Sequence, residues 1–425
     1  MSTPKSVNDL PAEILGMVFF EFLEEEAGQE SRRQHPGRLI CVCRLWKELV
    51  EGNSVLWSRV DVTLGNDTTI EVQPISNKIR KAKRFPLALH MHCGNPGFIR
   101  REAVTRDVLA LYGLIKDHRW RGISIFKPGY ILPFEIIFRH IVDHPQMCQL
   151  SYFHMGDTMY LFNDNVIRTL AMEALRQNPS ITHLAVPMDF LEPPHPVHPV
   201  NQVVSYLQLT GVYTPTSIFN HIREASSLRS LRVECLGMVT TDPDDLPSPC
   251  TLSKLEYLSL RTCHGFPKLL LQTLDLPRIW DLTLGLISCN IKQGDQQLKG
   301  LISDVPWLTR IKSLNLEEVE VSEVTLLWTL QRLPLLKRLA LTSWRKVTYK
   351  TTKKLSEQPT TRRGWLCPLL EETEFGACPR LSKSDVTALV EARVRDVPSS
   401  APASRISPNL LRKVIWGGRN LASGS

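Results

Sequence analysis

The chain has 425 residues, of which 43% are hydrophobic and 22% are charged, and its net charge at neutral pH is +8. These proportions are typical of a folded globular protein and exclude a broadly disordered chain. No run of eighteen apolar residues occurs, so the sequence predicts no membrane-spanning helix and no membrane partner. The first residues lack the basic start and apolar core of a secretory signal, and we therefore expect a cytoplasmic or nuclear protein.

The first predicted element is a helix that opens with Pro11, a residue well suited to the first position of a helix. Its sequence, LPAEILGMVFFEFL, is apolar on more than one face. A second run, LICVCRLWKELV at 39–50, has helical spacing, and SVLWSRVDV then leads into an extended segment. Two short helices make too small a core to be stable alone, so the excess of apolar surface predicts a partner protein.

The order of these residues resembles the F-box of fungal F-box proteins. The resemblance rests on Leu10-Pro11, Glu13, Ile14-Leu15, Val18-Phe19, Leu23, Leu39, Val42-Cys43-Arg44, Trp46 and Leu56-Trp57. It implies that residues 6–58 form an F-box domain, a small helical module that binds the Skp adaptor and, through it, a cullin-RING ubiquitin ligase. The adaptor contacts that we expect are Leu10, Pro11, Ile14, Leu15, Phe19 and Trp46.

This segment departs from the family in one respect. The hydrophilic stretch at 24–38 is longer than the connection that the family usually has, and its role stays open. The alternative is that residues 10–57 cap a larger core, with Trp46 and Trp57 as ordinary packing residues.

Two basic clusters follow, KIRKAKR at Lys78–Arg84 and HRWR at His118–Arg121. In the first cluster, Ile75 and Ile79 indicate a helix, and no aromatic residues interleave the charges as a single-strand binder would require. We therefore expect a solvated helix face and no nucleic-acid partner.

The rest of the chain repeats the pattern apolar-x-x-Leu-x-apolar. Nine copies begin at Ile181, Val204, Leu228, Leu255, Ile279, Ile311, Leu336, Leu370 and Leu411, and weaker copies begin at Phe85, Trp120 and Met147. Successive copies of the nine are 23 residues (181 to 204) to 41 residues (370 to 411) apart. Each copy predicts a short strand with one buried face. Helices with caps at Asn163 or Asp164, at Ser322, and at Ser384 or Asp385 are predicted between the strands.

This alternation predicts an α/β fold in which the strands stack in parallel and the sheet curves. It resembles the leucine-rich-repeat region of fungal F-box receptors. The resemblance implies an irregular leucine-rich-repeat solenoid at 59–416, followed by a disordered tail at 417–425. An ordinary α/β fold with a leucine-rich core is the alternative.

Strand residues that do not enter the core would line one recognition surface. We expect a protein substrate, whose identity the sequence does not reveal, to contact Arg232, Arg261, Trp280, Lys312 and Arg338. Arg and Trp give large, directional contacts and are enriched at binding hot spots.

Catalytic and metal-binding motifs are absent from the sequence. The ten cysteines include no CxxC pair and are expected to be reduced. His195 with His198, and Asp242 with Asp244 and Asp245, lie in proline-rich stretches that indicate exposed loops. We therefore expect no cofactor, no metal and no catalytic activity.

The function that follows is substrate recognition for an SCF-type E3 ubiquitin ligase, with the F-box on the adaptor and the repeat array on the target. The alternative is a leucine-rich-repeat scaffold for protein binding that is unrelated to ubiquitin. The sequence leaves the oligomeric state open.

Overall fold

The structure is a computed structural model of the whole chain. It describes residues 7, 10–25, 36–64, 70–93, 101–126, 134–156, 165–187, 202–213, 215–223, 225–238, 249–262, 268–286, 290–357, 366–394, 411–417 and 419–420. The chain divides into two compact units, Met1–Phe190 and Leu191–Ser425. The predicted boundary at residue 58 stays a prediction, and the division at 190 falls inside the predicted repeat array.

The first unit begins with a small group of helices. These are α1 (Ala12–Glu25), the 3-10 helix η3 (Pro36–Cys41), α2 (Arg44–Gly52) and α3 (Ser54–Trp57). Phe19 of α1 packs on Trp46 of α2, with ring centroids 4.6 Å apart, and the Trp57 indole donates to the Val50 carbonyl at 2.7 Å. The helix predicted to open with Pro11 is confirmed as α1, which begins one residue later, at Ala12. The run at 39–50 is not one helix, because Cys43 has an extended backbone between η3 and α2.

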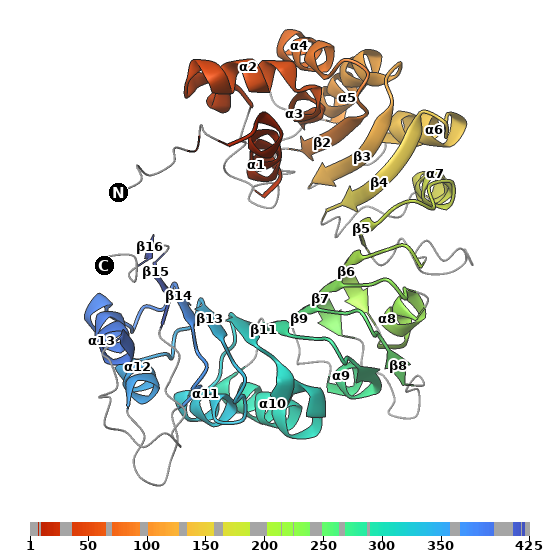
Figure 1. The fold of residues 1–425 in the computed structure, drawn as a ribbon. Helices are drawn as coiled ribbons and strands as arrows, with labels where there is room; N and C mark the ends of the chain where they lie inside the picture. The colour runs from red at the N-terminus through yellow and green to blue at the C-terminus, as the bar shows by residue number, and fades with distance from the viewer. Residues whose placement is uncertain are drawn as a thin grey trace. The chain divides into compact units, whose positions relative to one another are not determined.

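A parallel sheet follows the helices and completes this unit. Its strands are β1 (Arg59–Leu64), β2 (Leu87–Cys93), β3 (Trp120–Phe126), β4 (Cys148–Met155) and β5 (His183–Pro187), and its helices are α4 (Val72–Ala82), α5 (Arg101–Ile115), α6 (Glu135–Asp143) and α7 (Asn165–Arg176). The helices α4 to α7 lie on one face of the sheet (Figure 1). β1 corresponds to the extended segment predicted at the end of SVLWSRVDV, and it starts at residue 59, the predicted start of the array. Trp57, Val60 and Val62 form an unrecognised first copy, in which Val60 pairs with Leu89 of β2.

The second unit continues the same alternation of strands and helices. The parallel strands are β6 (Tyr206–Tyr213), β7 (Ser230–Met238), β9 (Tyr257–Thr262), β11 (Asp281–Leu286), β12 (Ser313–Glu317), β13 (Arg338–Thr342), β14 (Glu372–Gly376) and β15 (Lys413–Trp416). The helices are α8 (Pro215–Ile222), α9 (Lys268–Thr273), α10 (Ile291–Asp304), the 3-10 helix η7 (Pro306–Arg310), α11 (Glu323–Leu330), α12 (Tyr349–Ser356) and α13 (Lys383–Val394). They line one face of this sheet as well (Figure 1).

Short strands complete the second unit. The strand β16 (Arg419–Asn420) pairs antiparallel with β15, and β8 (Cys250–Thr251) pairs with β10 (Leu274–Asp275). β16 belongs to the predicted disordered tail, of which 418 and 421–425 lie outside the described residues.

The core of the second unit is a ladder of leucines at one register position. Leu231, Leu258, Leu282, Leu314 and Leu339 face their neighbours on successive strands, and each is at most 1% exposed. Each such burial stabilises the fold by about 1.5–3 kcal/mol. The predicted α/β fold with a parallel leucine-rich-repeat sheet is confirmed, and all nine predicted copies end in a strand of the structure.

Neighbouring repeats are also joined at the starts of their helices. Ser322 caps α11 by accepting from the Thr325 N–H, as predicted, and its own N–H donates to Asp295 of α10 at 2.7 Å. The predicted cap of α13 is wrong by at least two residues. Ser382 accepts from the Asp385 N–H, while the Asp385 carboxylate accepts from the Ser382 N–H at 2.9 Å, a reciprocal capping box.

A buried arginine links three segments near the end of this unit. Arg393 of α13 is 1% exposed and donates to the carbonyl oxygens of Leu355, Leu366 and Cys367. Burial lowers the pKa of Arg393 to about 10, so the guanidinium stays charged at neutral pH. These bonds attach the segment before β14 to the helix layer.

Candidate protein-docking surfaces

The outer side of α1 carries a stripe of exposed apolar side chains. Ile14, Val18 and Phe22 follow one another at intervals of four residues, Leu10 lies four residues before Ile14 and just before the helix, and each is 40–46% exposed. Since a helix turns once in 3.6 residues, this spacing keeps Ile14, Val18 and Phe22 on one side. Met17 on the same helix, and Val42 and Leu45 after η3, are also exposed. We call Leu10, Ile14, Met17, Val18 and Phe22 the outer face of α1.

The predicted adaptor residues fall into two groups. Leu10, Pro11 and Ile14 are exposed and available to a partner. Leu15 and Phe19 are each 1% exposed and build the core of the helical module, and Trp46 is half-buried against Phe19. The sequence-based choice missed Met17, Val18 and Phe22, although the four-residue spacing from Ile14 points to the last two.

A second surface is the side of the second unit's sheet that faces away from its leucines. Arg232 lies here and pairs with Glu234 of the same strand at 2.6 Å. Arg261 pairs with Glu317 at 3.0 Å, although their strands β9 and β12 are separated by β11. Gly285 of β11 makes this possible, because a Cβ there would lie 2.8 Å from the Arg261 side chain. Both arginines are therefore partly neutralised within the sheet.

The other three predicted substrate contacts, Trp280, Lys312 and Arg338, lie where successive strands begin, and backbone hydrogen bonds join them. The Lys312 N–H donates to the Trp280 carbonyl at 2.8 Å, and the Arg338 N–H donates to the Lys312 carbonyl at 2.9 Å. Trp280 is 43% exposed and Lys312 is exposed. The Arg338 guanidinium lies 3.8–3.9 Å from Glu372 and Glu374. The structure thus brings Trp280, Lys312 and Arg338 together.

The first unit has a histidine-rich group on its sheet that the sequence did not indicate. The Tyr152 hydroxyl is 3.0 Å from His90 Nε2, and the Tyr152 ring occupies the space over Gly122. Phe126 stacks on His92 and contacts His154, with ring centroids 4.5 and 4.7 Å apart. Burial, followed by the Arg59 charge, lowers the pKa of His90 to about 3, so His90 is neutral in the folded protein.

The same sheet contains a buried ion-pair group. Asp61 lies 2.9 Å from Arg59 and 3.4 Å from Lys78. Burial alone would raise the pKa of Asp61, but the Lys78 and Arg59 charges outweigh it and hold that pKa below its ordinary value. Burial lowers the pKa of Lys78, which is only 9% exposed. The expectation that 78–84 forms a solvated face is therefore wrong for Lys78.

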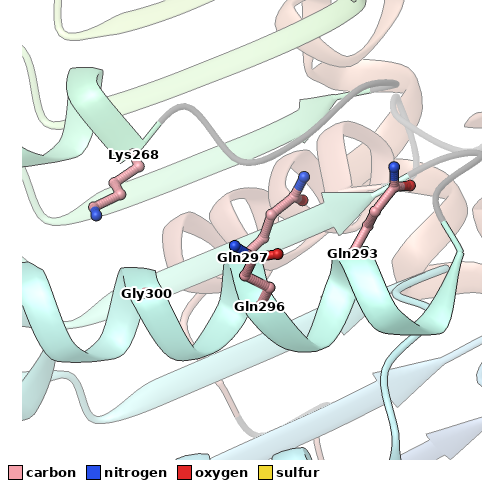
Figure 2. A pocket seen from close by; sticks show the side chains of 5 residues that line it. All are labelled: Lys268, Gln293, Gln296, Gln297 and Gly300. Atoms are coloured by element: carbon pink, nitrogen blue, oxygen red, sulfur yellow. The ribbon is translucent and has the colours of Figure 1, made fainter.

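Two cavities lie in the second unit. Figure 2 shows the first, of about 410 Å³, where Gln293, Gln296 and Gln297 of α10 lie near Lys268 of α9, a lysine that is paired with Asp304. The second, of about 440 Å³, includes Cys378. Burial raises the pKa of the Cys378 thiol, which disfavours the nucleophilic thiolate.

Within the described ranges, no three His, Cys, Asp or Glu side chains gather so that they could hold a metal ion. None of the helices in those ranges is long and apolar enough to cross a membrane. The histidine pair at 195 and 198 and the aspartates at 242–245 lie outside the described residues.

Comparison with known proteins finds distant similarities among solved structures. No family model and no curated protein matches the chain. Among solved structures, the chain is similar to one in "Crystal structure of Rad7 and Elc1 complex in yeast", with 14% identity, a TM-score of 0.43, and coverage of 88% of this chain and 90% of that chain. The F-box resemblance therefore stays a prediction.

Proposed function

We propose that the chain is the substrate-recognition subunit of an SCF-type E3 ubiquitin ligase. The observation that carries the proposal is the outer face of α1. It leaves Ile14, Met17, Val18 and Phe22 exposed on a helix whose Leu15 and Phe19 are each 1% exposed, and Leu10 is exposed just before that helix. A helix with apolar residues on two sides can bury only one of them in its own core, so the other side is available to a partner protein. The Skp adaptor is the partner that the F-box resemblance of this segment implies.

The repeat array would hold the target. Trp280, Lys312 and Arg338 lie in series at one edge of the second unit's sheet, and Trp280 offers a large exposed ring of the kind that anchors protein interfaces. Arg232 and Arg261 would contribute less, because each must exchange an existing partner, Glu234 or Glu317, for the target.

The mechanism would be proximity without chemistry on this chain. The helical module would hold the ligase and the array would hold the target, so that ubiquitin transfer gains effective concentration. The chain itself would be noncatalytic and would act in the cytoplasm or the nucleus.

The experiment that tests the proposal is assembly from purified components. The full chain is mixed with a fungal Skp adaptor and a cullin-RING core, and the complex is isolated by size exclusion. We expect a stoichiometric complex for the unchanged chain and for Val324→Asp, which places a charge on an exposed apolar position of α11 in the other compact unit. The double variant Ile14→Asp, Val18→Asp should elute alone.

Circular dichroism of each variant verifies that the chain is folded. If the folded, unchanged chain does not join the complex, the proposal is wrong and the ubiquitin-independent scaffold becomes the better account. If the double variant still assembles fully, the outer face of α1 is not the contact.

A further inference from the structure

Two basic segments that are far apart in the sequence lie side by side in the first unit. The Leu87 N–H donates to the Arg119 carbonyl at 2.7 Å, so the turn before β2 sits next to the turn before β3. The first turn carries Lys83 and Arg84, and the second carries Lys116 and Arg119. Together with Arg80 at the end of α4, they form what we call the basic edge.

The basic edge has an unbalanced positive charge. Arg80, Lys83, Arg84, Lys116 and Arg119 are all exposed, and in the part of the chain that the structure describes none of them forms an ion pair. Neighbouring lysines differ, because Lys78 is paired with Asp61 and Lys81 with Glu51. Asp117 is the one carboxylate within the two turns. Clustered charges of one sign raise the local potential and attract an oppositely charged partner.

The basic edge also adjoins α1. The Arg121 guanidinium, two residues after Arg119, lies 5.8 Å from the Phe20 ring of α1 and 5.9 Å from the Phe85 ring. Phe20 of α1 thus contacts Arg121, the strand residue that closely follows the turn of Lys116 and Arg119. A partner that covers the outer face of α1 would come close to the basic edge.

We propose that the basic edge binds a carboxylate-rich segment of the protein that docks on α1. This inference rests on the proposed function, which supplies the protein that docks on α1. It adds that this protein carries a negatively charged segment. A protein fits better than a nucleic acid for two reasons. An apolar helix face adjoins the cations, and the aromatic rings of this region, Phe85 and Trp120, are half-buried and buried, so they offer bases no stacking platform.

Charge reversal of the full chain tests this inference. The edge variant is Lys83→Glu, Arg84→Glu, Lys116→Glu, Arg119→Glu. The matched control reverses four exposed lysines on α10 and α12: Lys292→Glu, Lys299→Glu, Lys350→Glu, Lys353→Glu. The probes are a fluorescent glutamate-rich peptide, a DNA duplex of the same net charge, and the purified Skp adaptor. Anisotropy is followed at low and at physiological ionic strength, and adaptor association by stopped flow.

The expected results are specific to the edge variant. Peptide affinity and the association rate of the adaptor should each fall about tenfold or more in the edge variant and change little in the control, with salt weakening the peptide complex. Equal peptide binding by both variants would overturn the inference. Tighter binding of the duplex than of the peptide through the same residues would replace the protein partner by a nucleic acid.

The two proposals fail in different ways. If the adaptor does not bind the unchanged chain but the peptide is lost with the edge variant, the proposed function is wrong and the acidic-ligand site stands. If the adaptor binds both variants at the same rate and the peptide does not discriminate them, the proposed function stands and this inference is wrong.

Discussion

The Glu323 carboxylate of α11 accepts a hydrogen bond from the Thr351 N–H, at 2.8 Å, in the first turn of α12. It also accepts from the N–H and hydroxyl of Thr348, the N-cap of the same helix. One carboxylate thus accepts from backbone donors that the start of a helix leaves free. Its negative charge also interacts favourably with the positive end of the helix dipole. The contact joins two neighbouring repeats through side-chain chemistry rather than leucine packing.

Glu323→Ala should therefore loosen α12 more than an ordinary surface change. We expect a loss of about 1–3 kcal/mol in the free energy of unfolding, because buried donors lose their acceptor. Hydrogen exchange of the α12 amides should speed up as well. Glu357→Ala, which removes an exposed pair with Lys354, is the control and should cost under about 0.5 kcal/mol. Equal effects of the two changes would show that the Glu323 contact does not stabilise the fold.

Stability should depend on pH through His90. Its pKa falls from 6.5 to about 3 on folding, mainly by burial, so the folded chain binds fewer protons than the unfolded chain between these values. His90 makes its full contribution to the free energy of unfolding above pH 6.5. This contribution decreases by roughly 1.4 kcal/mol per pH unit as the pH falls toward 3.

The measurement is denaturant unfolding of the unchanged chain and of His90→Gln from pH 7 to 4.5. Glutamine keeps an acceptor for the Tyr152 hydroxyl but does not titrate. The difference in unfolding free energy between the two proteins, plotted against pH, should show the slope due to His90, because the contributions of the other titrating groups are the same in both. Parallel curves would mean that His90 is not neutralised by folding.

The glycine under Tyr152 should not tolerate a side chain. A Cβ at Gly122 would lie 2.1 Å from the Tyr152 ring, so Gly122→Ala should destabilise the chain by about 1–3 kcal/mol. Gly113→Ala on α5 meets no atom within 4 Å and should instead stabilise by roughly 0.5–1 kcal/mol. Thermal unfolding of both variants gives the comparison. A second change, Tyr152→Ser, should remove most of the extra cost at Gly122.

The strands were predictable because each repeat carries its own signal. The alternation of apolar and polar residues and the leucine at the fourth position determine each strand locally, whatever the length of the connection. The first strand, β1, was predicted as an extended segment but not as a copy of the repeat, because its pattern, Trp57-x-x-Val60-x-Val62, overlaps the end of the F-box-like segment. The last strand, β16, was not predicted, because its two residues carry no such pattern.

The surfaces were only partly predictable, because they depend on register between repeats of unequal length. The pairing of Arg261 with Glu317 crosses a whole strand at Gly285, and the contact of Tyr152 with His90 joins residues 62 positions apart. On α1, the sequence shows apolar residues on both sides but not which side faces the core. Packing of Phe19 on Trp46 decides this and leaves Ile14 and Val18 outside.

The central claim is that the outer face of α1 binds a Skp adaptor, and calorimetric titration of the full chain with the purified adaptor tests it most directly. The unchanged chain should bind at one to one, and Ile14→Asp should weaken the complex by about 100-fold or more, since it puts a charge into a desolvated contact. Leu109→Asp, at an exposed apolar position of α5, should bind like the unchanged chain. Absence of binding by the folded, unchanged chain, or equal affinity for Ile14→Asp, would contradict the account.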